Sequence, residues 1–191
     1  MFAHPVRDSF VGSLFDRVTR TLTESGVEVR VIDLYAEQFE PAMTLAQHRT
    51  YIDGIVPTAL QAHVDSLLWA DAIVLVYPTW FGTQPSILKG WFDRVWLPGV
   101  AFETSTGSGR LKPKLQNIRS IIVVTSHGSG KFMNSVQGEP GKRTALRGIR
   151  SLCGLRCRGR WIAFYKNDRA TDADRRAFLD RMATKLSKVV A

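Results

Sequence analysis

The fold is decided by residues 77 to 95, which read Tyr-Pro-Thr-Trp-Phe-Gly-Thr-Gln-Pro-Ser-Ile-Leu-Lys-Gly-Trp-Phe-Asp-Arg-Val. An apolar run over residues 72–77 stops at Pro78, an aromatic loop follows, and an amphipathic segment of helical spacing begins after it. This order predicts a strand that feeds a loop at its carboxyl end, where open α/β sheets bind their ligands. Trp80 and Phe81 favour a flat ring lying against this loop. The alternative is that both rings fill the sheet end as core, but two prolines and a glycine stiffen the loop more than core filling requires.

Strands alternate with helices along the rest of the chain. The sequence predicts strands over residues 27–33, 72–77, 120–125 and 160–165. It predicts helices over residues 9–24, 45–51 and 58–69, from Pro85 onward, over a basic segment that ends near Cys153, and after a capping box at residues 171–174. This alternation indicates one α/β domain over residues 1–191 with a doubly wound parallel sheet. Residues 103–117 are rich in Gly, Ser, Thr and Lys and are expected to form a surface excursion.

Composition points to a globular protein. A chain of 191 residues with 45% hydrophobic content suits one domain with a full core, and no apolar run approaches the roughly 18 residues of a membrane span. The amino terminus lacks the features of a secretory signal. Cys153 and Cys157 are spaced C-x-x-x-C on the predicted basic helix, so both thiols are expected on one face. Without a nearby histidine they make a poor zinc site, and we interpret them as buried reduced thiols of a cytoplasmic protein.

The net charge of +9 is concentrated in one segment. Between residues 142 and 160 the chain carries seven cations and no acidic residue: Lys142, Arg143, Arg147, Arg150, Arg156, Arg158 and Arg160. Such a patch attracts phosphate groups, whether of a nucleotide cofactor, a nucleic acid or a membrane surface; the alternative is a solvated helix face without a ligand. No aromatic residue interrupts these cations and no nucleic-acid motif is present, so we favour small phosphorylated ligands over nucleic acid.

Two further loops at predicted strand ends carry polar residues. Residues 3–10, Ala-His-Pro-Val-Arg-Asp-Ser-Phe, open the first helix, whose free N–H groups favour an anion. There His4 and Ser9 can donate hydrogen bonds to phosphate oxygens; equally, Ser9 or its neighbour is a plain N-cap and His4 a solvated loop residue. In residues 125–130, Thr-Ser-His-Gly-Ser-Gly, small side chains permit close backbone approach to a ring, although an ordinary turn also fits. His127 is a candidate acid or base, but loop histidines are more often solvated.

These three segments together resemble the flavodoxin-like NAD(P)H:quinone oxidoreductase family. The motifs are A-H-P-x-x-x-S-F, then Y-P-T-W-F-G-x-x-P-S-I-L-K-G-W-F-D-R-V, which is long and specific, and finally V-V-T-S-H-G-S-G. The resemblance covers nearly the whole chain. It implies a five-stranded flavodoxin-like sheet of order 2-1-3-4-5, bound FAD or FMN at the strand ends, NAD(P)H as co-substrate, and a homodimer with active sites at the subunit interface.

The resemblance also assigns roles by position. The residues that would hold the flavin phosphates are His4, Ser9 and Phe10. Those that would hold the isoalloxazine ring are Pro78, Thr79, Trp80, Phe81 and Gly82 on one side and Thr125, Ser126, His127 and Gly128 at its other edge. The residues that would border the substrate pocket are Trp80, Phe81 and Phe102.

The sequence departs from the family pattern at two places. Residues 133–140 contain neither the tyrosine nor the histidine with which some relatives balance charge on the reduced flavin. Only Met1 and Phe2 precede Ala3, where relatives have a full first strand. Losing several buried side chains at about 1.5–3 kcal/mol each would exhaust a typical stability margin. We therefore expect the first strand to be a truncated stub, or the native chain to start upstream of Met1.

The expected activity is hydride transfer from NAD(P)H to a quinone or a similar flat aromatic acceptor, in two steps at one face of the flavin. One alternative is a non-catalytic electron-carrier flavodoxin, although such carriers are usually acidic and this chain is basic. Another is a regulatory flavoprotein subunit that binds a membrane transporter through the basic patch. Binding of nucleic acid through the same patch is the least favoured reading.

Overall fold

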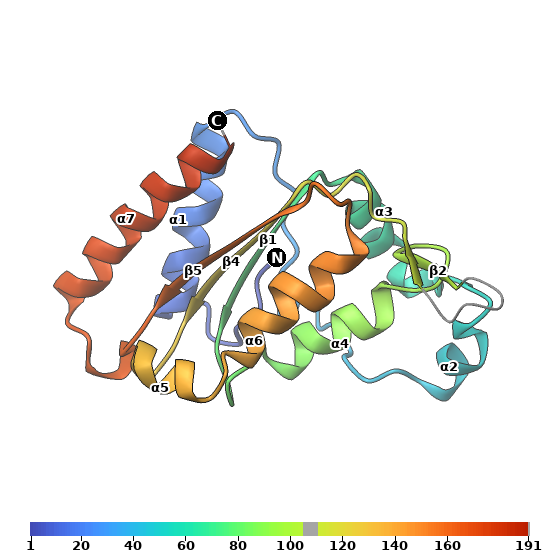
Figure 1. The fold of residues 1–191 in the computed structure, drawn as a ribbon, viewed down its shortest axis with the longest axis horizontal. Helices are drawn as coiled ribbons and strands as arrows, with labels where there is room; N and C mark the ends of the chain where they lie inside the picture. The colour runs from blue at the N-terminus through green and yellow to red at the C-terminus, as the bar shows by residue number, and fades with distance from the viewer. Residues whose placement is uncertain (105–110, 191) are drawn as a thin grey trace.

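A computed structural model describes residues 1–104 and 111–190 of the chain. At its centre lie three parallel strands, β1 (Ala72–Pro78), β4 (Ser120–Ser126) and β5 (Arg158–Phe164), in the order β1-β4-β5 (Figure 1). Every residue of β4 from Ile121 to Thr125 is shielded from solvent, as expected for a central strand of a parallel sheet. β5 lies at the edge of this sheet, and its Arg158 and Arg160 are exposed.

Residues 1–3 form a short stub at the place of the first strand. Phe2 forms parallel bridges to Val76 of β1 on one side and to Asp33 on the other. The Ala3 N–H donates to the Val76 carbonyl at 3.0 Å, and the Phe2 N–H donates to the Ile32 carbonyl at 2.8 Å. Taken across the sheet, the order is the segment around Asp33, the stub, β1, β4 and β5. This is the order 2-1-3-4-5 of a flavodoxin-like sheet.

The predicted strand over residues 27–33 is wrong in its extent. Only Asp33 pairs with the stub, and residues 27–32 have no ladder. The physical reason is that strand conformation needs a hydrogen-bonded neighbour, and the neighbour of these residues ends at Met1. The alternation of valines with charged residues is present, but nothing in residues 1–104 and 111–190 pairs with it.

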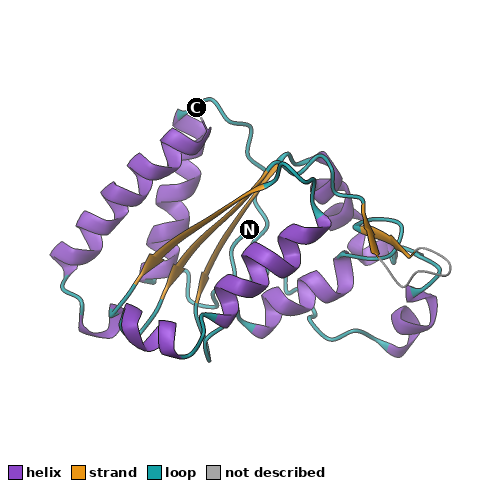
Figure 2. Cartoon of the chain, in the orientation of Figure 1, coloured by secondary structure: helices purple, strands orange, loops and turns teal. Residues whose placement is uncertain are grey.

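Helices cover both faces of the sheet (Figure 2). On one face α1 (Phe10–Glu24) packs against α7 (Asp172–Val190), with Ile122 and Val124 of β4 beneath them. On the other face α3 (Gln61–Trp69) and α4 (Ser86–Val95) cover Ile121 and Val123. Alternate side chains of the central strand thus pack into two separate apolar clusters, one on each face of the sheet. Helices on both faces of a parallel sheet define a doubly wound α/β domain.

The remaining elements are short. They are α2 (Leu45–Tyr51), η1 (Thr58–Leu60), β2 (Phe102–Thr104), β3 (Leu111–Pro113), α5 (Lys131–Val136), α6 (Pro140–Arg143), η2 (Thr144–Gly148), η3 (Ile149–Leu152) and η4 (Asn167–Arg169). The predicted surface excursion contains the antiparallel pair β2 and β3, and residues 105–110 of it lie outside the described residues. The predicted capping box is confirmed, because the Thr171 N–H donates to Asp174 Oδ2 at 2.9 Å and the Asp174 N–H to Thr171 Oγ1 at 3.2 Å.

The basic segment is helical but irregular, since α6, η2 and η3 follow one another with α, π and 3₁₀ hydrogen bonding. Cys153 comes directly after η3 and Cys157 lies in the turn before β5. The expectation that both thiols share one helix face is therefore wrong, because the helix ends at Leu152. Both thiols are buried and free, as expected.

Within residues 1–104 and 111–190, no helix has both the length and the apolar character needed to cross a bilayer.

Candidate functional site

Three loops meet where the parallel strands end. They are residues 4–9 after the stub, residues 79–84 after β1, and residues 127–130 after β4 (Figure 1). The Thr79 N–H donates to the Ser126 carbonyl at 2.8 Å, which joins the second loop to the third. The ring centroid of His4 lies 6.0 Å from that of Trp80, which places the first loop beside the second. The sequence prediction that these segments form one site at the carboxyl edge is consistent with this geometry.

The first loop is ordered around Ser9. Its side chain accepts a hydrogen bond from the Gly12 N–H at 3.1 Å and so caps α1. Ser9 Oγ is also 3.2 Å from His4 Nδ1, so the histidine is held against the helix start. No acidic residue occupies the first turn of α1, which leaves its positive dipole end uncompensated from within the helix. The loop therefore offers hydrogen-bond donors and a favourable potential for an anion.

Phe10 has a different role from His4 and Ser9, with which it was predicted to hold the flavin phosphates. Its ring packs against Phe164 at 4.9 Å and against Phe178 at 6.5 Å between centroids. The side chain thus belongs to the apolar contact between α1, β5 and α7, and only its backbone remains at the start of the helix.

The second loop is a tight two-residue hairpin. Trp80 and Thr83 exchange two backbone hydrogen bonds of 3.0 Å, while Phe81 and Gly82 have φ values of 48° and 78°. Two successive positive φ angles define a type I′ turn, and Gly82 occupies the position where glycine is preferred. Phe81 is fully exposed and Trp80 is 40% exposed, so neither ring serves as core. The turn presents two aromatic faces beside the sheet end.

The third loop begins with buried polar side chains. Thr125, Ser126 and His127 are each at most 6% exposed. Thr79 Oγ1 lies 3.0 Å from Thr125 Oγ1 and 3.3 Å from His127 Nε2, so a hydroxyl of the second loop links to both. The interpretation of His127 as a solvated loop residue is therefore wrong. The next residue, Gly128, packs so closely against η4 that a Cβ atom there would lie 2.4 Å from Asp168 Oδ2.

Burial determines the charge state of His127. Desolvation lowers its pKa below the ordinary value, against smaller opposing influences of Asn134 and Glu139. The imidazole is consequently neutral at pH 7, and its Nδ1 has no hydrogen-bond partner within the described residues. This nitrogen is itself closed off from solvent, so a ligand reaches it only when the third loop opens.

Sequence reasoning missed Tyr165, which follows directly after β5. Its ring stacks on His127 with centroids 4.7 Å apart and an interplanar angle of 19°. Its hydroxyl approaches Glu139 Oε1 at 3.5 Å, and Glu139 Oε2 accepts from Lys142 Nζ at 2.8 Å. The hydrogen bond from Lys142 lowers the pKa of Glu139, which keeps it a carboxylate. The sequence could have indicated this contact, because in a parallel sheet the residue after the fifth strand lies beside the loop after the fourth strand.

Phe102 is not brought together with the other predicted residues. It lies in β2, where it pairs with Pro113, and its partly buried ring packs against the apolar cluster under α3 and α4. In Figure 1 β2 lies next to α3, away from the carboxyl ends of β1 and β4. Its role at a substrate pocket stays a prediction.

The residues present fit a planar ligand that carries an anionic tail. Exposed rings of Trp80 and Phe81 lie next to the polar group of Thr79, Thr125 and His127, while the start of α1 supplies donors for an anion a short way along the same edge. A flavin nucleotide combines these features, since its ring is flat and polar at one edge and its tail ends in phosphate.

Comparison with known proteins identifies the family. The flavodoxin-like fold family model matches residues 1–186. The chain belongs to this family. It is 32% identical over 157 residues to an uncharacterised NAD(P)H oxidoreductase of Haemophilus influenzae, covering 81% of this chain and 77% of that protein. It is 30% identical to rat NAD(P)H dehydrogenase [quinone] 1 over 178 residues, or 81% of this chain, and this match spans only 64% of the rat protein, less than two thirds of its length.

Solved structures agree on the fold. An NAD(P)H:quinone oxidoreductase of Methanothermobacter marburgensis matches with a TM-score of 0.81 and 24% identity, over 100% of this chain and 94% of that one. An FMN-dependent NADH-azoreductase of Bacillus anthracis, determined in complex with FMN, matches with a TM-score of 0.76 and 15% identity, over 100% and 96% of the two chains. At these identities the likeness extends to the fold alone.

Proposed function

We propose that the protein is a flavin-dependent oxidoreductase that transfers hydride from NAD(P)H to a quinone or a similar flat aromatic acceptor in a two-step, ping-pong reaction. The observation that carries this proposal is the pairing of an exposed aromatic type I′ turn with the buried Thr79–Thr125–His127 group at one edge of the sheet. Relatives named NAD(P)H oxidoreductase and NAD(P)H dehydrogenase [quinone] support it.

The three loops divide the task of binding FAD or FMN. His4, Ser9 and the first N–H groups of α1 would hold the phosphate, because they combine donors with the positive end of a helix dipole. Residues 78–82 would hold one side of the isoalloxazine ring and residues 125–128 its other edge. The bound flavin would supply the two-electron chemistry, which no side chain of the protein provides.

His127 is the residue to which we assign a catalytic role. Its imidazole is neutral and buried, and when the third loop opens its Nδ1 would donate or accept one hydrogen bond at the flavin edge without adding charge. Tyr165 fixes the plane of this ring by stacking, and Thr79 fixes its Nε2.

The acceptor would lie flat against Trp80 and Phe81, and a homodimer would complete its pocket. Exposed apolar side chains of α5, which follows the third loop, support such a dimer, among them Phe132 and Val136. Phe102 lies away from the loops of its own protomer, and in the dimer it would approach the site of the partner subunit. The free buried thiols favour action in the reducing cytoplasm.

The test is to purify the protein, record its visible spectrum, release any chromophore by heat and identify it as FAD or FMN. Oxidation of NADH and of NADPH is then followed with a benzoquinone and with an azo dye, and initial rates at varied concentrations of both substrates should give the parallel lines of a ping-pong reaction. A folded protein that is colourless, cannot be reconstituted with either flavin and oxidises neither nicotinamide contradicts the proposal.

A further inference from the structure

The outer side of β5 carries the part of the basic segment to which the proposed function gives no role. β5 is the last strand in the order β1-β4-β5, and within residues 1–104 and 111–190 no strand pairs with its outer side (Figure 1). Its own residues 158–160 contribute two of the seven cations that lie between residues 142 and 160. A row of unpaired backbone groups and a cluster of positive charge therefore meet on one strand.

Alternate residues of β5 direct their backbone hydrogen-bonding groups away from β4. The Arg158 N–H donates to the Arg119 carbonyl at 2.8 Å, so Arg158 and every second residue after it face β4. Because successive residues of a strand direct their N–H and C=O groups to opposite sides, those of Gly159, Trp161 and Ala163 face outward. All three residues are partly accessible to solvent. Each of them offers one donor and one acceptor to a further strand.

Exposed arginines flank this row of backbone groups on both faces of the sheet. Arg158 and Arg160 are exposed and share the face that α1 and α7 cover, since side chains of a strand alternate. On the other face η2 and η3 lie over the start of β5, because a Cβ atom at Gly159 would lie 3.4 Å from Arg150 Cδ. The exposed Arg147 belongs to η2. In the described part of the chain Arg147, Arg158 and Arg160 form no ion pair.

This combination favours an acidic polypeptide over other polyanions. Nucleic acid and anionic lipid offer phosphate oxygens to arginines, but neither has a backbone that forms a ladder with β5. An extended peptide pairs with the outward groups by adding a strand, and its carboxylates pair with the arginines. Because its side chains alternate, acidic residues at every second position lie next to Arg158 and Arg160. The positions between them lie on the face of Trp161, whose partly buried ring favours apolar, β-branched neighbours.

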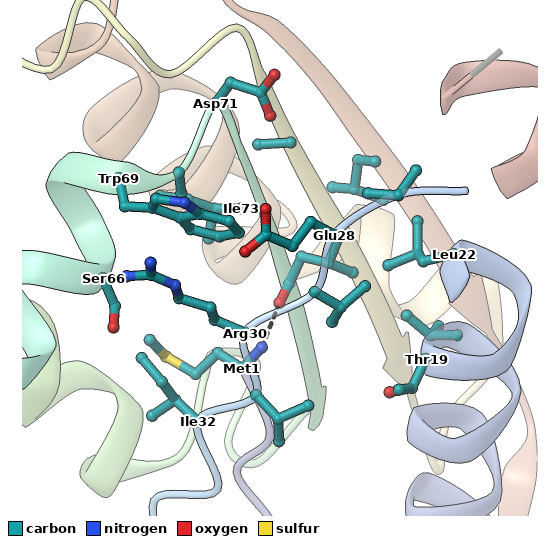
Figure 3. A pocket seen from close by; sticks show the side chains of 18 of the residues that line it. Met1, Thr19, Leu22, Glu28, Arg30, Ile32, Ser66, Trp69, Asp71 and Ile73 are labelled. Atoms are coloured by element: carbon teal, nitrogen blue, oxygen red, sulfur yellow. Dashed lines mark hydrogen bonds between the residues drawn. The ribbon is translucent and has the colours of Figure 1, made fainter. Parts of the chain in front are cut away.

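The opposite side of the sheet does not offer the same charge. Residues 27–32 there line an apolar cavity of about 140 Å³ beside β1 (Figure 3). This segment has one cation, Arg30, and one carboxylate, Glu28, and both line the cavity. The Arg30 guanidinium lies 4.1 Å from the ring centroid of Trp69, so its charge is already engaged within the chain (Figure 3). An acidic partner is therefore directed to β5.

We propose that the outer side of β5 is a docking site for an acidic segment of a partner polypeptide, which adds to the sheet as a further strand. The bound segment pairs with the outward backbone groups of Gly159, Trp161 and Ala163 and places carboxylates beside Arg158 and Arg160. This docking requires neither a flavin nor a nicotinamide, so it is independent of the proposed function.

The test uses the fluorescein-labelled peptide Glu-Val-Glu-Val-Glu-Val-Glu, whose binding to the 191-residue chain is followed by fluorescence anisotropy. The variant Arg158→Gln/Arg160→Gln removes the partners of the carboxylates and is expected to weaken binding by about tenfold. The matched variant Arg20→Gln/Arg49→Gln removes the same charge from α1 and α2 and is expected to bind within about twofold of the parent. Equal weakening by the two variants, or no saturable binding to the parent protein, overturns the proposal.

Pairing of the backbones is tested with two methylated peptides. One carries N-methyl groups on its glutamate amides and the other on its valine amides, so charge and composition stay the same. Only one of these sets of amides faces β5, and methylation of that set is expected to weaken binding by about tenfold or more. Methylation of the other set is expected to change affinity by less than about threefold. Equal affinities of the two methylated peptides indicate attraction of charge alone and overturn the proposal.

Hydrogen exchange followed by NMR locates the bound strand. The unmethylated peptide is expected to slow exchange of the Gly159, Trp161 and Ala163 amides by about tenfold or more. The Arg160 and Ile162 amides already pair with β4 and are expected to change little. Absence of protection at the three outward amides overturns the proposal.

Nucleic acid and lipid are tested with a short DNA duplex and with vesicles that contain phosphatidylserine. Both are expected to respond equally to the two double variants, since a diffuse polyanion responds to overall charge. A loss of DNA or vesicle binding that is confined to Arg158→Gln/Arg160→Gln, together with no protection of the outward amides by the peptide, assigns the surface to that polyanion and overturns the proposal.

Discussion

At the scale of single residues, His127 shows how burial changes the meaning of a side chain. In the sequence it stands between a serine and a glycine, a context typical of an exposed turn. In the structure its ring is stacked on Tyr165 and bonded to Thr79, which makes it part of the sheet end. The sequence does not give this directly, because both contacts come from residues about 40 or more positions away along the chain.

Replacing His127 tests this placement. His127→Phe keeps an aromatic ring to stack on Tyr165 but removes both ring nitrogens. Loss of one hydrogen bond to bound flavin is expected to weaken flavin binding by about tenfold, measured by quenching of flavin fluorescence. The matched variant Tyr165→Phe keeps the stacking and the histidine and is expected to bind flavin within about threefold of the parent. Unchanged affinity in His127→Phe would remove the residue from the site.

The first turn of α1 depends on one glycine. A Cβ atom at Gly12 would lie 1.9 Å from the Arg7 carbonyl oxygen, which is backbone and cannot rotate away. Gly12→Ala is therefore expected to displace residues 4–9 and to lower the free energy of unfolding by about 1–3 kcal/mol in chemical denaturation. Gly148→Ala is the control, because that helical glycine has nothing within 4 Å of its Cβ position, and it is expected to be neutral or slightly stabilising. Equal effects of the two substitutions would contradict this.

At the scale of elements, the predictions held where an element is specified by its own residues. β1 and β4 are apolar runs that end at the binding loops, and α2 has the predicted bounds. The strand predicted over residues 27–33 failed because a strand is a property of a pair, and no ladder forms with residues 27–32 within residues 1–104 and 111–190. The prediction of one regular helix over the basic segment failed in part, because π and 3₁₀ turns do not produce a regular spacing of apolar residues in the sequence.

The stub gives the 191-residue chain a specific pH dependence. The Met1 amino group has a pKa of about 6 when folded and near 8 when unfolded, so between these values the unfolded chain holds more protons. The free energy of unfolding is thus expected to rise by up to about 3 kcal/mol from pH 6 to pH 8 and to lack this gain below pH 6. An acetylated amino terminus should abolish this rise. Burial also lowers the pKa values of His63 and His127, but these groups contribute equally to the acetylated and the unmodified chain. Identical pH profiles of the two chains would therefore refute the assignment of the rise to the Met1 amino group.

At the scale of the whole molecule, the sheet order followed from the family resemblance, and the three loops could be located because their motifs stand at strand ends. The sequence was not sufficient for Phe102, whose proposed contact lies across a subunit boundary and cannot be seen in one chain. Two of the seven cations of the basic patch make local contacts, because Arg150 donates to the Leu146 and Cys157 carbonyls and Lys142 pairs with Glu139. These two cations support local structure.

A homodimer has a direct test in light scattering, where the mass is expected to be twice the 21.4 kDa of one chain. Phe132→Glu places a charge on α5 beside the third loop, and we expect it to shift the mass toward that of a monomer, because burying an unpaired carboxylate is costly. Leu155→Glu is the control, since Leu155 is fully exposed in the turn before β5, far along the strand from the loops. A monomeric parent protein, or dissociation by Leu155→Glu alone, would contradict the proposed interface.

The arginines of β5 have a consequence beyond ligand binding. An edge strand offers free backbone groups to any passing strand, and unprotected edges lead to aggregation. Here Arg158 and Arg160 of the edge strand are exposed to solvent, so two molecules that approach edge to edge bring four guanidinium groups together. We therefore expect the positive charge to oppose the formation of intermolecular sheets, and we expect this protection to weaken as salt screens the repulsion.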